Sequence, residues 1–450
     1  MISRLDLDER VREWQLHEAV VEKDYVIGWL LWGIASDPTL SRSWAFKGGT
    51  CLKKCYIETF RFSEDLDFSV LRGGAFTPEE VIPRLRDVLR RVHDASGIDF
   101  SREEPRYEVR RSGESAEGRI YYIGPRRAPT VAMIKLDVTA TEEIVRPTVL
   151  RDIGHSYPDG LPVPAKVRCY AFEEVFAEKL RALGERGRPR DLYDVILLFR
   201  RPDLRGHADL IQDTLVEKCI TKNVPVPSLE MVTAELARAA LEAEWENMLG
   251  HQLPELPPFE HVWGEVPALF EWLAGSALSE ELTSIAAGAG EDADWAPPPL
   301  VATWGRGIPL EVVRFAAANH LCVELGYNRQ ERVIEPYSLR RTRDGNLLLY
   351  GIRVVDGELR AYRVDRIESV RATRTPFRPS AAIEFTARGP LLAPPIRKGR
   401  STRASGSTAK YVVECARCGR RFARKKHNAR IRPHKDRDGW PCSGRRGHFV

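Results

Sequence analysis

The sequence feature that most constrains the fold is the stretch from Phe46 to Val70, FKGGTCLKKCYIETFRFSEDLDFSV. It predicts a strand, a glycine-rich turn at a helix N-terminus and, about 15 residues later, a second strand. Side chains two positions apart in a strand lie on one face, so Asp65 and Asp67 would project together, close enough to share divalent metal ions. Free N–H groups and a helix dipole would face a triphosphate at the turn residues Lys47, Gly48, Gly49 and Thr50.

Each half of this pattern is weak by itself, because most Gly-Gly turns are only turns and a DxD is often a solvated strand edge. Their succession resembles the GGS or GGT followed by DxD of the DNA polymerase β-like nucleotidyltransferases. The fuller string KGGT…RFSEDLDF is similar to the AbiEii-type nucleotidyltransferase toxin family. The resemblance covers roughly residues 15 to 275. It implies an enzyme that moves a nucleoside monophosphate from an NTP to an acceptor, with Ser63 beside the nucleotide.

The composition is ordinary for a globular chain of two to four domains, since 43% of the 450 residues are hydrophobic and 30% are charged. No stretch approaches the roughly 20 apolar residues that span a bilayer, and the N-terminus is charged, so we expect a cytoplasmic protein without membrane contact. The charge is uneven: residues 396–450 carry 17 Lys and Arg against 3 Asp and Glu, a net charge of +14, and the remainder carries −9. Such a tail attracts polyanions or is merely solvated.

A strand-rich region follows a predicted helix over residues 77–95, with strands expected at 106–109, 119–123 and 130–139. Asp137 lies toward the end of the last strand, where it is either a buried carboxylate that needs a partner or an exposed strand end. Nucleotidyltransferases use a third carboxylate from a nearby strand. The resemblance therefore implies two Mg²⁺ ions held by Asp65, Asp67 and Asp137.

A second block reads EKLRALGERGRPRDLYD, with a helix over residues 173–183 and another that opens at Asp191. From the residues alone, Lys179 is a surface lysine and Asp191 an N-cap. The resemblance implies that both belong to the active site, with Lys179 on the triphosphate and Asp191 orienting it or the base; Asp194 is a further candidate. The family also carries an element like the EKDY of residues 22–25, which the residues alone suggest is the solvated face of a helix.

We expect a nucleotidyltransferase domain with a helical cap over residues 1–275, a linker over 276–299 and a small β-rich domain over 300–395. The third segment resembles a WYL domain, although Leu347-Leu348-Leu349-Tyr350 replaces the name-giving Trp-Tyr-Leu. WYL domains are regarded as ligand-sensing or nucleic-acid-sensing modules. An anion site is one interpretation, and a structural or solvated role the other, for the arginines Arg332, Arg360, Arg363 and Arg366.

A flexible basic linker over residues 396–409 precedes a predicted zinc module over 410–450. A CxxC knuckle followed by further Cys and His is typical of a tetrahedral zinc site. So short a block has little apolar core, so Zn²⁺ would supply much of its folding free energy. The other five cysteines are expected to be buried thiols. The chosen zinc ligands are Cys415, Cys418, His434 and Cys442, with His427 and His448 as competitors.

The fold class we predict is α+β: a mixed-sheet nucleotidyltransferase core with a helical cap, a small β-rich domain and a zinc-stabilised C-terminal module. The resemblance implies a toxin of a toxin–antitoxin or phage-defence system, with a cognate antitoxin as a possible partner and a tRNA 3′ end as the acceptor. The basic module fits RNA or DNA. Two alternatives stay open: a nucleic-acid-binding regulator with a degenerate catalytic domain, and nucleotidylation of a protein side chain.

Overall fold

The computed structural model describes residues 1–57, 61–201, 207–275, 282–286, 310–385, 391–394, 411–424, 426–436 and 441–450. The chain divides into two compact units, Met1–Pro394 and Pro395–Val450. Helices and a mixed sheet make up the start of the first unit and β-rich regions follow, which confirms the predicted α+β class. The predicted linker over 396–409 lies outside the described residues, as does most of the linker over 276–299.

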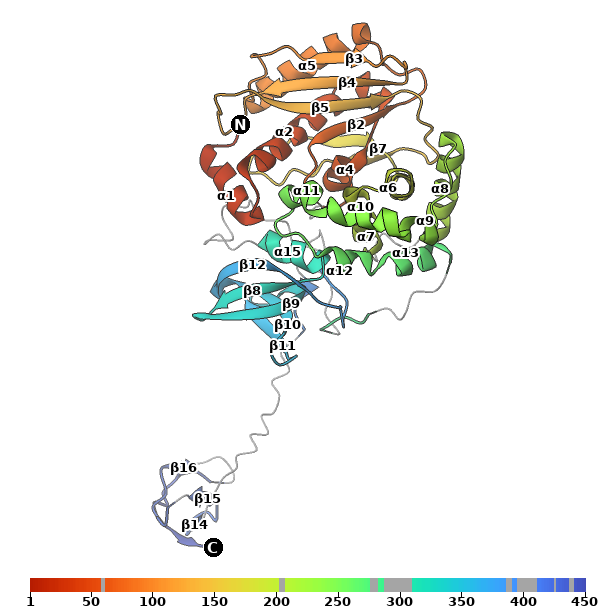
Figure 1. Cartoon of the computed structure of the whole chain (residues 1–450). Coiled ribbons are helices and arrows are strands. Elements are labelled where there is room, and N and C mark those ends of the chain that lie inside the picture. The colour runs from red at the N-terminus through yellow and green to blue at the C-terminus, as the bar shows by residue number, and fades with distance from the viewer. Residues whose placement is uncertain are drawn as a thin grey trace. The chain divides into compact units, whose positions relative to one another are not determined.

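The N-terminal region contains, in order, α1 (Arg4–Trp14), α2 (Glu18–Ala35), α3 (Leu40–Ser43), β1 (Trp44–Lys47), α4 (Gly48–Cys51), the π-helical turn η1 (Leu52–Tyr56), β2 (Asp65–Val70), α5 (Pro78–Ser96), β3 (Arg106–Val109), β4 (Ser115–Tyr122), β5 (Ala132–Thr139), β6 (Val149–Asp152) and β7 (Lys166–Cys169). The helical part continues with α6 (Phe172–Arg186), α7 (Pro189–Phe199), α8 (Ala208–Lys222), α9 (Leu229–Thr233), α10 (Glu235–Ala243), α11 (Trp245–Leu249), the 3₁₀ turn η2 (Gly250–Gln252), α12 (Phe259–Trp263) and α13 (Val266–Leu273). Figure 1 shows these later helices gathered on the side of β2 and β7.

The seven strands form one mixed sheet in the order β3-β4-β5-β2-β1-β7-β6. β1 runs antiparallel to β2 and parallel to β7, and β2 runs parallel to β5. Strand alternation gives the sheet an apolar face, where Phe46, Phe68 and Leu136 are fully buried. The opposite face of the same strands carries charged side chains. The sheet thus presents polar groups of β1, β2, β5 and β4 side by side.

The interpretation of residues 22–25 as a solvated helix face is wrong, because α2 is buried on almost every side. Glu22 is 2% exposed and accepts hydrogen bonds from the backbone N–H and Nε of Arg126, at 2.6 and 2.9 Å. Asp24 is 4% exposed and lies 2.8 Å from the Lys54 amino group. Buried charges of this kind need partners, and these ion pairs fasten α2 to the loops around it.

The β-rich part of the first unit consists of α15 (Leu310–Ala318), β8 (Leu321–Tyr327), β9 (Gln330–Arg341), β10 (Leu347–Arg353), β11 (Leu359–Arg363), the 3₁₀ turn η3 (Val364–Arg366), β12 (Ile367–Pro376) and β13 (Leu391–Leu392). Its strand order is β11-β10-β9-β8-β12, and β13 pairs with β9. The predicted turns lie at Gly345 and Gly357, which both have positive φ. Of the predicted anion-site arginines, Arg360 and Arg363 are paired with acidic neighbours on the same hairpin.

This region packs against the helical part through buried polar contacts. The Tyr193 hydroxyl on α7 donates to Asn319 Oδ1 at 2.9 Å, and both side chains are buried.

The second unit contains β14 (Tyr411–Cys415), β15 (Arg421–Arg424), β16 (His434–Lys435), β17 (Pro441–Cys442) and β18 (Gly447–Phe449). None of the helices in the described parts of the chain is long and apolar enough to cross a membrane.

Candidate active site

A row of charged side chains crosses the polar face of the sheet. Lys47 on β1 is in register with Asp67 on β2, and Asp67 is in register with Asp137 on β5. Residues directly opposite each other in neighbouring strands project to the same face. Asp65 lies two positions before Asp67 and therefore projects with it. The structure thus brings the three predicted carboxylates and Lys47 onto one surface.

The glycine-rich turn meets this row at its centre. Gly48 has φ +78°, and a Cβ there would lie 2.3 Å from Asp67 Oδ2, so both the backbone conformation and the space require glycine. A Cβ on Gly49 would lie 2.7 Å from an Arg61 nitrogen and 3.2 Å from Ser63 Oγ. The turn therefore lies between the DxD carboxylate and the Arg61–Ser63 segment, as the order of these elements in the sequence suggests.

The electrostatics of the two DxD carboxylates differ from those of ordinary surface aspartates. Burial, with the nearby charges of Asp137 and Asp65, raises the pKa of Asp67 to about 6 in spite of Lys47. Burial also raises the pKa of Asp65. No hydrogen bond or ion pair joins either carboxylate to another side chain in the described part of the chain. This pair of carboxylates therefore carries negative charge that a bound cation would neutralise.

Asp137 is in a different state, because basic groups already contact it. Its Oδ2 lies 2.7 Å from the Lys135 amino group and its Oδ1 lies 3.3 Å from Arg110. The hydrogen bond to Asp137 raises the pKa of Lys135. In the described part of the chain, the carboxylate oxygens of Asp65, Asp67 and Asp137 do not all lie within 4.8 Å of one another, as the atoms of a ready-made metal site would.

The second sequence block forms a buried ion-pair cluster, so two interpretations from the residues alone are wrong. Lys179 is not a surface lysine: it is 8% exposed, and its amino group lies 2.7 Å from Asp194 and 3.4 Å from Asp191. Asp191 is not the N-cap of α7, which is Arg188; it lies in the first turn. Burial would raise the pKa of Asp191, but Lys179 and a hydrogen bond from Arg186 outweigh it and lower that pKa.

Arg61 connects this cluster to the DxD strand. Its guanidinium binds Asp194 through two nitrogens, at 2.8 and 2.9 Å, and Gln252 through the third, at 2.9 Å. Two-pronged arginine–carboxylate pairs are strong and fix orientation. Asp194 thus holds both Lys179 and Arg61. The sequence offered Asp194 only as a further candidate, through the resemblance of the RPRDLYD block to the family.

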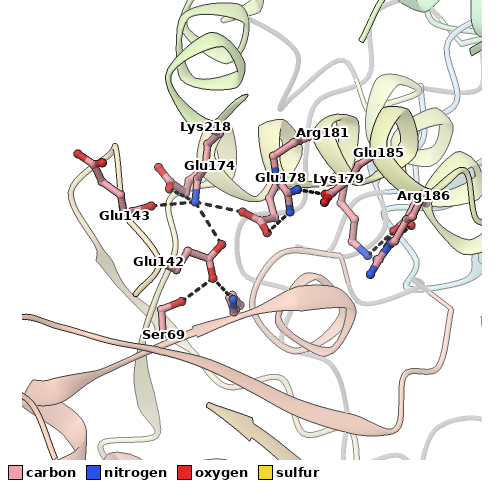
Figure 2. A network of polar contacts seen from close by, with 12 residues as sticks. Ser69, Glu142, Glu143, Glu174, Glu178, Lys179, Arg181, Glu185, Arg186 and Lys218 are labelled. Atoms are coloured by element: carbon pink, nitrogen blue, oxygen red, sulfur yellow. Dashed lines mark hydrogen bonds and ion pairs between the residues drawn. The ribbon is translucent and has the colours of Figure 1, made fainter. Parts of the chain in front are cut away.

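Lys47 belongs to a second network, which Figure 2 shows from close by. Its amino group is ion-paired with Glu142, which also accepts a hydrogen bond from the Ser69 hydroxyl at 3.1 Å. Glu142 lies 3.6 Å from the buried Lys218 amino group, which pairs with Glu174 at 2.7 Å and with a third glutamate at 3.0 Å. Sequence reasoning missed Glu142 and Lys218, because Glu142 is 95 positions from Lys47 and 76 from Lys218, and no local pattern marks contacts over such separations.

In the C-terminal unit the four predicted zinc ligands converge. The ligand atoms of Cys415, Cys418, His434 and Cys442 all lie within 4.8 Å of one another. The Cys415 and Cys442 sulfurs are 3.9 Å apart, and Cys418 Sγ lies 3.3 Å from His434 Nε2. His434 Nδ1 faces the Arg432 carbonyl oxygen at 3.0 Å, an arrangement in which Nδ1–H donates and the Nε2 lone pair is left for a metal. The set is therefore compatible with zinc.

The competing histidines lie elsewhere in this unit. His427 stacks on the Phe449 ring, with centroids 4.0 Å apart, and meets the edge of Tyr411. His448 is on β18, in register with Glu414, and is not part of the converging group. A Cβ on Gly444 would lie 2.5 Å from Cys415 Sγ, so the backbone closes tightly around the sulfurs.

Comparison with known proteins agrees with this geometry. A family model described as the nucleotidyl transferase AbiEii toxin of a type IV toxin–antitoxin system matches residues 29–274, which is more than half of the chain. This protein belongs to the AbiEii family of nucleotidyltransferase toxins. It is therefore a nucleotidyltransferase, and a cognate antitoxin is an expected partner of an AbiEii toxin. The alternative of a regulator with only a degenerate catalytic domain is not favoured by the intact turn, DxD and Lys179 block.

The WYL domain model matches residues 310–372, the region of α15 and β8–β12. Among solved structures, the toxin is similar to MenT4, a nucleotidyltransferase toxin from Mycobacterium tuberculosis H37Rv. The sequence identity is 21% and the TM-score 0.39, over 58% of this chain and 85% of that one. No curated protein matches the chain.

Proposed function

We propose that this AbiEii toxin transfers a nucleoside monophosphate from an NTP to RNA, in a reaction that depends on divalent metal ions held at Asp65 and Asp67. The supporting observation is that two carboxylates, neither paired with another side chain in the described part of the chain, meet the Gly48 turn on one face of the sheet. Carboxylate oxygens are the protein ligands that Mg²⁺ prefers. The raised pKa of Asp67 marks a charge that a cation would relieve. The donor set therefore fits Mg²⁺.

Bound Mg²⁺ supplies charge neutralisation at the triphosphate and lowers the pKa of the attacking hydroxyl. The chain's own groups do the positioning. The backbone N–H groups of Gly48, Gly49 and Thr50 would bind the phosphates, and the Thr50 hydroxyl, which donates to the Asp65 carbonyl oxygen, fixes the turn to β2. Basic side chains already contact both oxygens of Asp137, Lys135 at Oδ2 and Arg110 at Oδ1. We therefore assign the first metal contacts to Asp65 and Asp67.

Lys179 would offset triphosphate charge, and Asp191 and Asp194 would hold its ammonium in place. This role fits its position, since a lysine held between two carboxylates has little freedom to move. Lys47 is held at the end of the β1 strand by Glu142, which also accepts a hydrogen bond from Ser69, and Lys47 would line the same surface.

RNA is the acceptor we favour because the C-terminal unit is strongly basic. Its net charge of +14 attracts phosphates independently of sequence. A tRNA 3′ end is the specific acceptor we propose, since it offers a single-stranded terminal hydroxyl. DNA binding would use the same electrostatics, and a protein side chain is the competing acceptor.

The proposal is tested by incubating the purified toxin with each α-labelled NTP in turn, Mg²⁺ and total cell RNA. The expected result is label in an RNA of tRNA size, lost when the RNA is first oxidised at its 3′-terminal ribose with periodate. Label in the toxin or in another protein, with none in RNA, would replace the RNA acceptor with a protein one. Transfer that persists undiminished with excess chelator would contradict metal dependence.

The Lys179→Ala substitution is expected to lower kcat/KM for the NTP by about 10- to 100-fold, which corresponds to the loss of one charge-assisted contact. It should also lower the free energy of unfolding by about 1–3 kcal/mol, because a buried pair is broken while Arg61 and Arg186 still neutralise the two aspartates. Lys222→Ala, at an exposed lysine of α8, is the matched control. An unchanged kcat/KM over a full NTP titration would remove Lys179 from the active site.

A further inference from the structure

Three cysteines gather directly behind the phosphate-binding turn. Cys51 ends α4, Cys55 lies one turn later in η1, and Cys169 ends β7. Their sulfur atoms all lie within 4.8 Å of one another, and all three side chains are buried. Only five of the eight cysteines precede Pro394, so three of those five meet at one point although they come from two distant segments.

We propose that Cys51, Cys55 and Cys169 form a binding site for one thiophilic metal ion, Zn²⁺ or Cu⁺, distinct from the C-terminal cysteine and histidine site. Soft thiolate sulfurs select these ions over Mg²⁺. Sulfur atoms at this separation can converge on one ion with bonds of about 2.3 Å. Metal binding displaces the thiol protons to solvent, so each coordinating cysteine binds as the thiolate.

The surroundings of the cluster supply what a thiolate site needs. The Tyr56 hydroxyl donates to the Tyr170 carbonyl oxygen and lies 3.9 Å from Cys169 Sγ, so its oxygen would serve as a fourth ligand. The Arg151 guanidinium carbon lies 4.6 Å from the Tyr56 ring centroid, and its Nε donates to the Cys55 carbonyl oxygen at 3.2 Å. Arg151 would offset the net negative charge that three thiolates leave around a divalent ion.

The clustering sets these three cysteines apart from the other buried thiols of the first unit. Cys219 and Cys322 are also buried, but neither belongs to a described group of side chains whose ligand atoms all lie within 4.8 Å of one another.

A metal in this place would connect the turn to the sheet. Cys51 immediately follows Thr50, and Cys169 is in register with Phe46, the residue before Lys47. A bound ion would therefore join the C-terminal end of the turn to β7 by coordinate bonds, and β1, which leads into the other end, is already paired with β7. This consequence rests on the proposed nucleotide site, but metal binding by the cluster does not.

The test uses the full chain with Cys415→Ser and Cys442→Ser, which removes two of the four C-terminal ligands and leaves the three-cysteine cluster intact. Cd²⁺ is the probe, because thiolate-to-cadmium charge transfer absorbs in the ultraviolet and carboxylate-bound Cd²⁺ does not. We expect one equivalent of Cd²⁺ with this absorbance. Zn²⁺ is then added as a competitor, and Cu⁺ is added in a second arm under reducing conditions. Loss of the cadmium absorbance shows which of the two ions displaces Cd²⁺.

Adding Cys169→Ser to that protein should abolish the binding of this one equivalent of Cd²⁺. Adding the control substitution Cys219→Ser should preserve it. If Cys169→Ser does not fold, Cys55→Ala, which removes a slightly more exposed sulfur, takes its place, with circular dichroism as the check. The absence of the absorbance from the parent protein would overturn the proposal. So would an equivalent of Cd²⁺ that survives loss of a cluster cysteine. Because the readout is metal binding and not transfer, a failure of the nucleotidyltransferase assignment would leave this result unaffected.

Discussion

Replacing Asp67 by asparagine is expected to lower nucleotidyl transfer by about 10³-fold or more and, in the absence of metal, to make the fold more stable. The loss of transfer follows because a carboxylate that holds the metal contributes several kcal/mol to charge stabilisation in the transition state, and each 1.36 kcal/mol is tenfold in rate. Single-turnover transfer at saturating NTP and Mg²⁺ measures this effect. Asparagine keeps the shape of the side chain beside Gly48, so the turn is not disturbed.

The gain in stability follows from the pKa of about 6, which is above the ordinary value of 3.8. Between these two pH values the folded protein binds more protons at Asp67 than the unfolded chain does, so this residue makes stability fall as pH rises. Above about pH 6 the folded wild-type toxin carries the full free-energy cost of an ionised Asp67, and asparagine, which has no charge, removes that cost. We expect the free energy of unfolding of Asp67→Asn to exceed that of wild type by about 1–2 kcal/mol at pH 8 with chelator present. This figure allows for solvent around the half-buried carboxylate. Denaturant unfolding at pH 8 and pH 4 should show the difference shrinking at the lower pH.

Glu117→Gln is the matched control, because Glu117 lies on the same face of the sheet, in register with Asp137, and pairs with Arg110 and Arg119 at the surface. It should change the rate of transfer and the free energy of unfolding only slightly, because surface ion pairs contribute little. The assignment would fail if folded Asp67→Asn protein kept near-normal transfer. Lost transfer with reduced stability would instead indicate that Asp67 has a structural role.

Local signals in the sequence predicted most of the elements that carry the site. The strand over 106–109 is found as β3 with the same bounds. The helix expected over 77–95 is α5, whose start is fixed by a capping box between Thr77 and Glu80. The turn residues and the two DxD aspartates could be placed because strand alternation and glycine preference act over a few residues.

What the sequence could not reveal depends on contacts between distant segments. The parallel pairing of β2 with β5 places Asp137 opposite Asp67, and no local pattern fixes that register. Lys179 lies on α6 among buried apolar residues, so its side chain is in the interior, where Asp194 and Asp191 bind its amino group. Burial of such a charge is unfavourable without partners, so composition alone favours the surface. The pairing of Lys47 with Glu142 joins residues 95 positions apart.

Removing the C-terminal metal is expected to unfold the second unit while leaving NTP binding by the first unit in place. Structural zinc in peptides of this size contributes an apparent 10–16 kcal/mol of binding free energy at neutral pH, far more than a small apolar core can. The buried core here consists of Val413, Ile431 and two of the ligand cysteines. Cys442→Ser should therefore abolish both the metal and the fold of residues 411–450. Loss of protection from hydrogen exchange over β14, β15 and β18 measures the unfolding.

His448→Ala is the control for this experiment, because His448 lies on β18 outside the converging ligands. It should keep its zinc and its exchange protection, whereas Cys442→Ser loses both. The affinity for RNA should fall with Cys442→Ser, and the slope of log Kd against log salt should flatten by about 0.7 for each single-strand phosphate contact that depends on the folded unit. An unchanged salt slope in the unfolded variant would show that the basic side chains act without the zinc fold. Equal zinc content in Cys442→Ser and wild type would show that the four converging residues are not the site.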